Sequence, residues 1–215
     1  MRIIVKFISI FTLLIFSNIT LAEGPARVYM IEGFPFKSPF RAAWKFGVDT
    51  VKEHIRANYP DAKFKDLHNN DWYSVCKELK ELPPEQKPSK LVLIGHSYGA
   101  WATVQISLCL KGIMKVDTLV TIDPITKIAD DPNAERLHDI RNVPENVKKH
   151  YNYYESSDLL LSGVDNMRAI NKDCTESTNE LIKVGFTLSP HNRIVEILAE
   201  TSRLQKHVDD TFKSL

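Results

Sequence analysis

The sequence lacks several features that would point to particular classes of protein. Neither charge is in excess, because 28 Lys and Arg residues stand against 27 Asp and Glu residues in a chain of 215. A strongly basic face that would bind nucleic acid is therefore not expected. Internal repeats, low-complexity segments and the composition shift that marks a second domain are not evident either. The length suits one domain with a sizeable core.

Cysteine is scarce, with only Cys76, Cys109 and Cys174. These residues form no C-x-x-C pair and no cluster with histidine at zinc-ligand spacing, so neither a metal nor an organic cofactor is implied. In an exported protein an odd number of cysteines leaves one thiol unpaired. Cys109 falls in an apolar stretch where a small buried side chain is ordinary. That leaves Cys76 with Cys174 as a conceivable disulfide.

The first 22 residues have the organisation of a secretory signal peptide. Two basic residues precede an apolar run from Phe7 to Phe16, and a small residue, Ala22, stands at the expected cleavage position. The run is short for a membrane span of about 20 residues, and no cysteine follows the cleavage position as in a lipoprotein. We therefore expect a periplasmic or secreted protein whose single domain covers residues 23–215 and whose membrane contact is at most peripheral.

The stretch from Leu91 to Trp101 is the most informative in the chain. Its first four residues are apolar and predict a buried parallel strand, and the residues after Gly99 predict a helix. Between them, residues 95–99 read GHSYG, the G-x-S-x-G pattern of a nucleophile elbow. The pattern predicts that Ser97 stands above the sheet on a sharp turn and that the Tyr98 N–H points toward a developing oxyanion. The alternative is a glycine-rich strand-to-helix turn that binds phosphate.

Strands and helices alternate along the rest of the chain. Apolar or alternating segments predict strands at residues 27–31, 62–67, 91–94, 116–122, 147–155 and 182–187. Helical spacing of apolar residues predicts helices at residues 38–59, 71–82 and 100–110, with one closing helix after residue 189. This order predicts an α/β fold with a mostly parallel central sheet of about six strands flanked by helices. Polar segments 125–146 and 159–181 are expected to wall the site as loops.

A serine nucleophile needs a base, and the base needs an acid that orients it. Histidines follow Ser97 at positions 138, 150, 191 and 207. Only His191 stands between the predicted last strand and the closing helix, at the same sheet edge as Ser97, so we predict it as the base. His96, behind the serine, is expected to pack beneath the elbow instead.

Two aspartates stand at the ends of the strands that follow the elbow. Asp123 directly follows an apolar strand and is held by Pro124, whereas Asp158 follows the tyrosine-rich strand. Both lie at carboxyl ends of strands and could orient His191. We favour Asp123 because the apolar strand before it offers a buried, rigid seat, and we keep Asp158 as the alternative acid.

These motifs resemble the α/β-hydrolase family, among its lipases, esterases and thioesterases. GHSYG is similar to the lipase elbow, and VTIDP resembles the segment that carries the acid in pancreatic-type lipases. The resemblance implies an α/β-hydrolase-like sheet that lacks the family's first two antiparallel strands. It also implies a second oxyanion donor in the loop after the first strand. There Glu32-Gly33-Phe34 replaces the usual HG motif, so Phe34, with Gly33 as second choice, would donate beside Tyr98.

The sequence thus predicts a serine hydrolase that cleaves a carboxylic ester or thioester through an acyl-enzyme on Ser97. An acyltransferase with the same triad and a non-catalytic binding module on a hydrolase scaffold are the alternatives. Phe34, Phe36, Phe40 and Tyr98 would supply apolar surface near the serine, which favours a small-molecule or lipid acyl ester over a charged substrate. The pattern leaves the acyl chain, the choice of ester or thioester and the oligomeric state open.

Overall fold

The computed structural model describes residues 24–33, 41–125, 140–157, 164–185, 187 and 189–214. The predicted signal peptide lies outside these residues. The same is true of Phe34, Phe36, Phe40 and Asp158, so their expected roles stay predictions.

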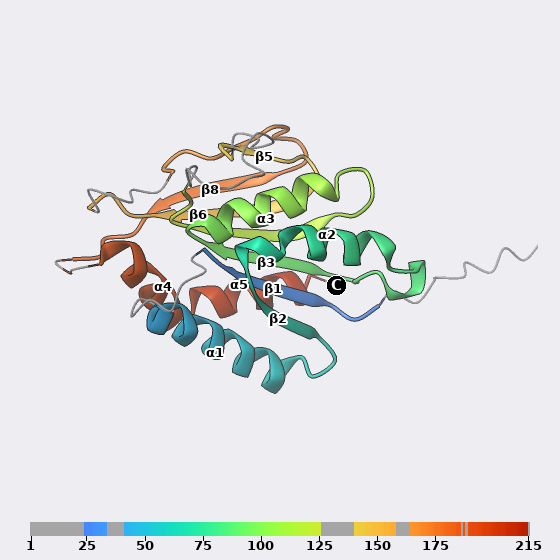
Figure 1. The fold of residues 1–215 in the computed structure, drawn as a ribbon, viewed down its shortest axis with the longest axis horizontal. Helices are drawn as coiled ribbons and strands as arrows, with labels where there is room; N and C mark the ends of the chain where they lie inside the picture. The colour runs from blue at the N-terminus through green and yellow to red at the C-terminus, as the bar shows by residue number, and fades with distance from the viewer. Residues whose placement is uncertain are drawn as a thin grey trace, which may run out of the picture.

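A six-stranded sheet in the order β2-β1-β3-β4-β6-β8 forms the centre of the molecule, and each neighbouring pair is parallel (Figure 1). Its strands are β1 (Arg27–Glu32), β2 (Lys63–His68), β3 (Leu91–His96), β4 (Val116–Ile122), β6 (Val147–Tyr154) and β8 (Glu176–Leu181). The three apolar strands β1, β3 and β4 are buried along their whole length, as expected of central strands covered on both faces. The predicted α/β fold with a mostly parallel sheet is confirmed.

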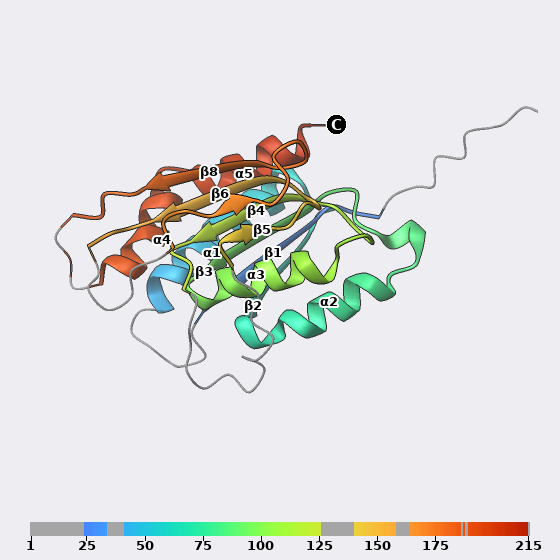
Figure 2. The same cartoon turned by 90° about the horizontal axis from the view of Figure 1, so that it is seen from above.

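Helices cover both faces of the sheet (Figure 1, Figure 2). One face carries α1 (Arg41–Asn58), α4 (Pro190–Glu200) and α5 (Arg203–Phe212), and the other carries α2 (Trp72–Glu81) and α3 (Tyr98–Cys109). Alternate residues of β3 feed two cores: Val92 and Ile94 face the first group of helices, and Leu91 and Leu93 face the second. Single turns η1 (Asn69–Asp71) and η2 (Pro84–Gln86) flank α2, and β5 (Asn142–Val143) pairs with β7 (Arg168–Ala169).

The last strand lies earlier in the chain than its apolar pattern predicts. Residues 182–187 were expected to form it, but β8 (Glu176–Leu181) pairs with β6 instead. β8 is an edge strand whose side chains are largely exposed, so its sequence ESTNEL carries no apolar signal. The expectation that residues 159–181 form only a connection is therefore wrong.

The closing helix is divided in two. Ser202 has a left-handed backbone with φ 56° between α4 and α5. Apolar residues continue at helical spacing on both sides of this residue, so the pattern alone predicts one helix. None of the helices in the described parts of the chain is long and apolar enough to cross a membrane.

The disulfide suggested by the sequence is wrong. Cys76 in α2 is joined to Cys109 in α3, with their Cα atoms 6.2 Å apart, and Cys174 is an exposed free thiol. The two helices lie on the same face of the sheet, a neighbourhood that cysteine spacing cannot reveal. The bridge ties the helix that follows Ser97 to the helix beside it.

Candidate active site

Ser97 stands at the turn between β3 and α3 with an unusual backbone. Its φ of 58° and ψ of −126° lie in a region that residues with a side chain rarely adopt, and the residue is fully buried. The Ser97 N–H donates to the Ile122 carbonyl at 2.9 Å, and its own carbonyl accepts from the Ala100 N–H at 3.1 Å. The neighbouring strand and the first turn of α3 therefore hold the strained turn in place.

The two glycines of the motif are required by close backbone contacts. A Cβ added to Gly95 would lie 2.4 Å from the Gly99 carbonyl oxygen. A Cβ added to Gly99 would lie 2.0 Å from the Ile31 carbonyl oxygen. Neither contact can be relieved by moving a flexible side chain, so the turn admits only glycine at both positions.

Gly33, which directly follows β1, lies against the same turn. A Cβ at this position would lie 2.6 Å from the Ser97 Cβ and 2.6 Å from the Tyr98 nitrogen. The Tyr98 N–H is at the N-terminal end of α3, where the helix dipole favours negative charge. The Gly33 backbone and the Tyr98 N–H therefore lie close to each other beside Ser97.

Asp123 and His191 are hydrogen-bonded to each other at this edge of the sheet. Asp123 directly follows β4, and its Oδ2 accepts from His191 Nδ1. Its other oxygen accepts from the Glu155 N–H at 3.3 Å, and its own N–H donates to the Tyr153 carbonyl at 2.6 Å. Both side chains of the pair are almost completely buried. Burial raises the pKa of Asp123, while the hydrogen bond and charge of His191 lower it.

His191 presents its second ring nitrogen without a hydrogen-bond partner among the described residues. It lies in the first turn of α4, after Ser189 and Pro190, rather than in the preceding loop as predicted. Its Nε2 and the Ser97 Oγ are both buried and unbonded there. The Ser97 backbone forms hydrogen bonds on both sides of Asp123. Its N–H donates to the Ile122 carbonyl, and its carbonyl accepts from the Ile125 N–H at 3.4 Å. The described residues thus link Asp123 to His191 by a side-chain hydrogen bond and to Ser97 through neighbouring backbone bonds, whereas Ser97 Oγ and His191 Nε2 are not hydrogen-bonded to each other.

His96 lies beneath this group. Its Nε2–H donates to the His191 carbonyl at 2.8 Å, and its ring packs against the rings of Trp44 and His191, with centroid distances of 6.0 and 4.6 Å. Burial lowers the pKa of His96 to about 3, so its ring is neutral. It supports the position of His191, as its place behind the serine predicts.

Two further histidines belong to buried hydrogen-bond networks. His150 bonds Thr121 at 3.0 Å and Ser177 at 2.9 Å, and His207 bonds the Tyr153 hydroxyl at 2.7 Å. Burial lowers the pKa of His150 to about 3 and that of His207 to about 4. Each has a structural use, and His138 lies outside the described residues.

Glu155 is a site residue that sequence reasoning missed. It directly follows β6, is 1% exposed, and bonds Asp123 through its N–H. The sequence pattern predicts that the tyrosine-rich strand ends at Glu155, so Asp158 is the first acidic residue expected after it. The sequence feature that marks Glu155 is an acidic residue directly after β6, the strand that pairs with β4.

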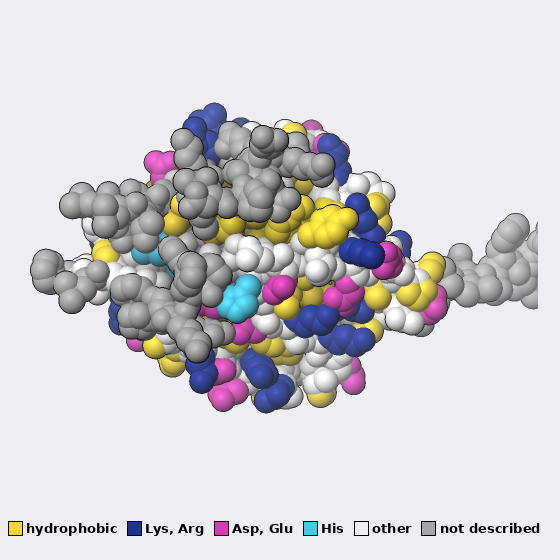
Figure 3. All heavy atoms as spheres, viewed as in Figure 1, with side chains coloured by type: hydrophobic (Ala, Val, Ile, Leu, Met, Phe, Trp, Pro, Cys, Tyr) yellow, Lys and Arg dark blue, Asp and Glu magenta, His cyan; other side chains and the backbone are white. Residues whose placement is uncertain are grey.

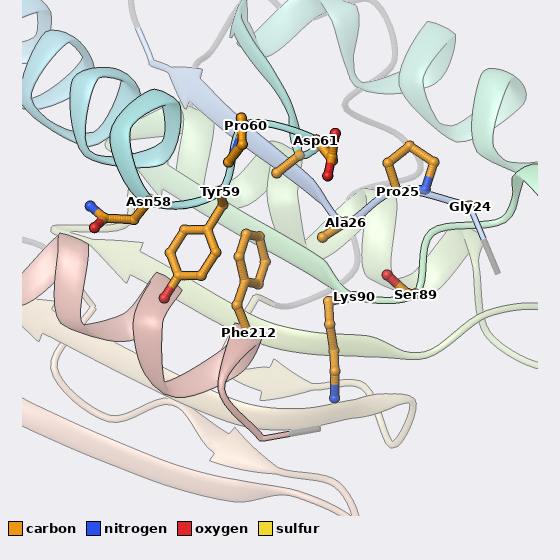
Figure 4. Close-up of a pocket in the computed structure, with 11 residues that line it drawn as sticks. Gly24, Pro25, Ala26, Asn58, Tyr59, Pro60, Asp61, Ser89, Lys90 and Phe212 are labelled. Carbon is orange, nitrogen blue, oxygen red and sulfur yellow. The ribbon is translucent and has the colours of Figure 1, made fainter.

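A cavity of about 440 Å³ lies at the amino ends of the strands, opposite the carboxyl ends that carry the candidate site (Figure 4). It is lined by residues that precede β1, β2 and β3, and by Tyr59 and Phe212, whose rings meet edge to face at 4.8 Å. Since Ser97 follows β3, the whole length of that strand separates the cavity from the candidate site. Figure 3 shows acidic and basic side chains intermixed on the described part of one face.

Comparison with protein-family models gives no match, and comparison with curated proteins gives none either. Within the described ranges, no three His, Cys, Asp or Glu side chains are grouped to bind a metal ion. The fold and the site define an α/β protein with a buried Asp–His pair beside a strained serine.

Proposed function

We propose that this protein is a serine hydrolase of the α/β-hydrolase type, which cleaves a carboxylic ester or thioester through an acyl-enzyme on Ser97. The observation that carries the proposal is the Asp123–His191 hydrogen bond at the sheet edge where Ser97 stands. An Asp–His pair orients the base that a serine hydroxyl needs. The strained backbone of Ser97 supports the same function, because strain of this kind concentrates at functional sites.

The proton path follows from the tautomer of His191. Because Nδ1–H donates to the Asp123 carboxylate, Nε2 carries the lone pair and can accept a proton. His191 takes the Ser97 hydroxyl proton as Oγ bonds to the substrate carbonyl carbon, and Asp123 stabilises the resulting imidazolium. Nε2 then protonates the leaving alcohol or thiol. In the second half of the reaction a water molecule adds to the acyl carbonyl carbon as it loses a proton to His191. His191 then returns this proton to the Ser97 Oγ as the Oγ–acyl bond breaks, which releases the acid and regenerates the serine.

The oxyanion formed in each half is stabilised by backbone N–H groups in this proposal. The Tyr98 N–H is the first donor, since it follows the nucleophile at the positive end of α3. The loop at Gly33 and Phe34 is the source of the second. The close approach of Gly33 to the Tyr98 nitrogen supports this arrangement.

The surroundings of the serine favour an uncharged acyl substrate. Tyr98 is buried and stacks on Trp101 with ring centroids 4.5 Å apart, and Trp72 meets Trp101 edge to face. We expect apolar side chains beside the serine to favour an alkyl or aryl group over a charged one. A small-molecule or lipid acyl ester is the proposed substrate class, and periplasmic or secreted location after removal of residues 1–22 is proposed with it.

Labelling with a fluorophosphonate probe tests the proposal. We expect a single adduct on the peptide that carries Ser97, which Ser97→Ala abolishes and Ser74→Ala, a change at an exposed serine of α2, preserves. Absence of labelling in folded protein would favour the non-catalytic alternative and contradict the proposal. Product analysis with added methanol separates the remaining two functions: free acid as the main product supports a hydrolase, and methyl ester as the main product supports an acyltransferase.

A further inference from the structure

The Glu155 side chain is a buried carboxylate that accepts defined hydrogen bonds. It is 1% exposed, and its Oε2 accepts from the Ser157 N–H at 2.6 Å and from the Ser157 hydroxyl at 2.7 Å. Burying a carboxylate is costly unless hydrogen bonds satisfy it. The Ser157 contacts meet part of this need and fix the turn that follows β6. The mechanism above uses neither residue.

The same turn holds Asp123. The Glu155 N–H donates to Asp123 Oδ1, while His191 Nδ1 donates to Oδ2, so the two carboxylate oxygens have different and fixed partners. The adjacent hydrogen bond from the Asp123 N–H to the Tyr153 carbonyl locks the end of β4 to the end of β6. A rotation of the Asp123 carboxylate away from His191 would therefore break the bond to Glu155 as well.

Glu155 also acts on this pair through its charge. Burial is the main cause of the raised pKa of Asp123, and the negative charge of Glu155 raises it further. The charged or titratable groups that face Asp123 are His191 of α4 and Glu155 after β6, and His96 of β3 faces His191. His96 stays neutral, since burial lowers its pKa to about 3. Glu155 is thus a described side chain outside the pair whose negative charge acts on Asp123.

We infer that Glu155 is a positioning residue that acts on His191 through Asp123. Its N–H fixes Asp123 Oδ1 so that Oδ2 faces His191, and its buried carboxylate places a negative charge beside the Asp123–His191 pair. The inference rests on the proposed function, because the pair must act as the base for this effect to reach catalysis.

The pH dependence of kcat/KM in Glu155→Gln tests the inference. Glutamine keeps an oxygen that can accept from Ser157 but removes the negative charge, so the pair loses its proton more readily. We expect the acid limb of the profile to move to lower pH by about 0.5–1.5 units, with KM little changed. Glu176→Gln, at an exposed position of β8, should leave the profile in place. A Glu155→Gln profile that matches the wild type, or moves to higher pH, overturns the inference.

A second variant covers the case in which Glu155→Gln does not fold. Ser157→Ala keeps the Glu155 charge and removes one of its hydrogen bonds, so we expect kcat to fall about 3–10-fold at unchanged KM. An unchanged kcat in that case overturns the inference. Failure of the proposed function looks different, because wild-type protein would then show neither turnover nor fluorophosphonate labelling. If the wild type is labelled and active but Glu155→Gln leaves the pH profile unchanged, the inference about Glu155 is refuted while the proposed function stands.

Discussion

Acidification from pH 7 to pH 5 should destabilise this protein strongly through its buried histidines. Burial lowers the pKa of His96 and His150 to about 3 and that of His207 to about 4. The unfolded chain takes up these protons near pH 6.5, where histidine normally titrates. Between the native and unfolded values the unfolded state therefore binds more protons, so stability falls as the pH falls through 6.5.

The loss of stability at pH 5 depends mainly on the pKa of histidine in the unfolded chain, because all three native pKa values lie below 5. Each histidine costs about 2 kcal/mol between pH 7 and pH 5, or roughly 5–6 kcal/mol for the three together. The raised pKa of Asp123 has the opposite sign, since the native state then binds this proton more tightly than the unfolded chain. The lowered pKa values of Glu78 and Asp209 matter only below the normal range of carboxylates. The expected loss is comparable to the whole stability of a typical domain, about 5–15 kcal/mol.

Urea unfolding at pH 7, 6 and 5, at constant ionic strength, measures the effect. His207→Gln should be less stable at pH 7, because it disturbs the hydrogen bond with Tyr153, but its loss between pH 7 and pH 5 should be about one third smaller. A free energy of unfolding that is flat between pH 7 and pH 5 would refute this reasoning. An undiminished slope in His207→Gln would refute it for that residue.

Three further predictions concern the elbow and its partners. Asp123→Asn should lower kcat by about 10²–10⁴-fold and Asp158→Asn by much less, and the reverse order in steady-state assays would reassign the acid. Gly99→Ala should lower the free energy of unfolding by about 3 kcal/mol or more in thermal unfolding, because its Cβ would lie 2.0 Å from a backbone oxygen. Gly47→Ala is the control: its Cβ would meet only side-chain atoms, so it should lower stability less. Equal losses in the two variants would contradict the contact. Hydrolysis of p-nitrophenyl esters should persist or increase with acyl length if the apolar core near Ser97 holds the acyl group, whereas activity confined to acetate would contradict that arrangement.

The elbow and the strands around it were predictable because their signals are local. The apolar runs of β3 and β4 mark central strands, and the glycines of the motif are set by backbone contacts within about one turn of the chain and with β1. The sheet edge shared by Ser97, Asp123 and His191 also followed from the rule that parallel strands present their carboxyl ends together.

The features that escaped prediction depend on neighbours distant in sequence or on weak apolar patterns. β8 is polar because its edge position leaves its side chains exposed. The Cys76–Cys109 bridge depends on α2 lying beside α3, and the role of Glu155 depends on the end of β6 lying beside the end of β4. No spacing along the chain encodes either contact.

Mass spectrometry of the acyl-enzyme is the most direct measurement of the central claim, that Ser97 is a nucleophile activated by the Asp123–His191 pair. Protein mixed with p-nitrophenyl acetate and quenched in acid should carry an acetyl group on the peptide that contains Ser97, formed together with a burst of nitrophenol. His191→Ala should abolish the adduct and the burst while the protein stays folded. An acetyl group on another residue, or an unmodified Ser97 during turnover, would contradict the account.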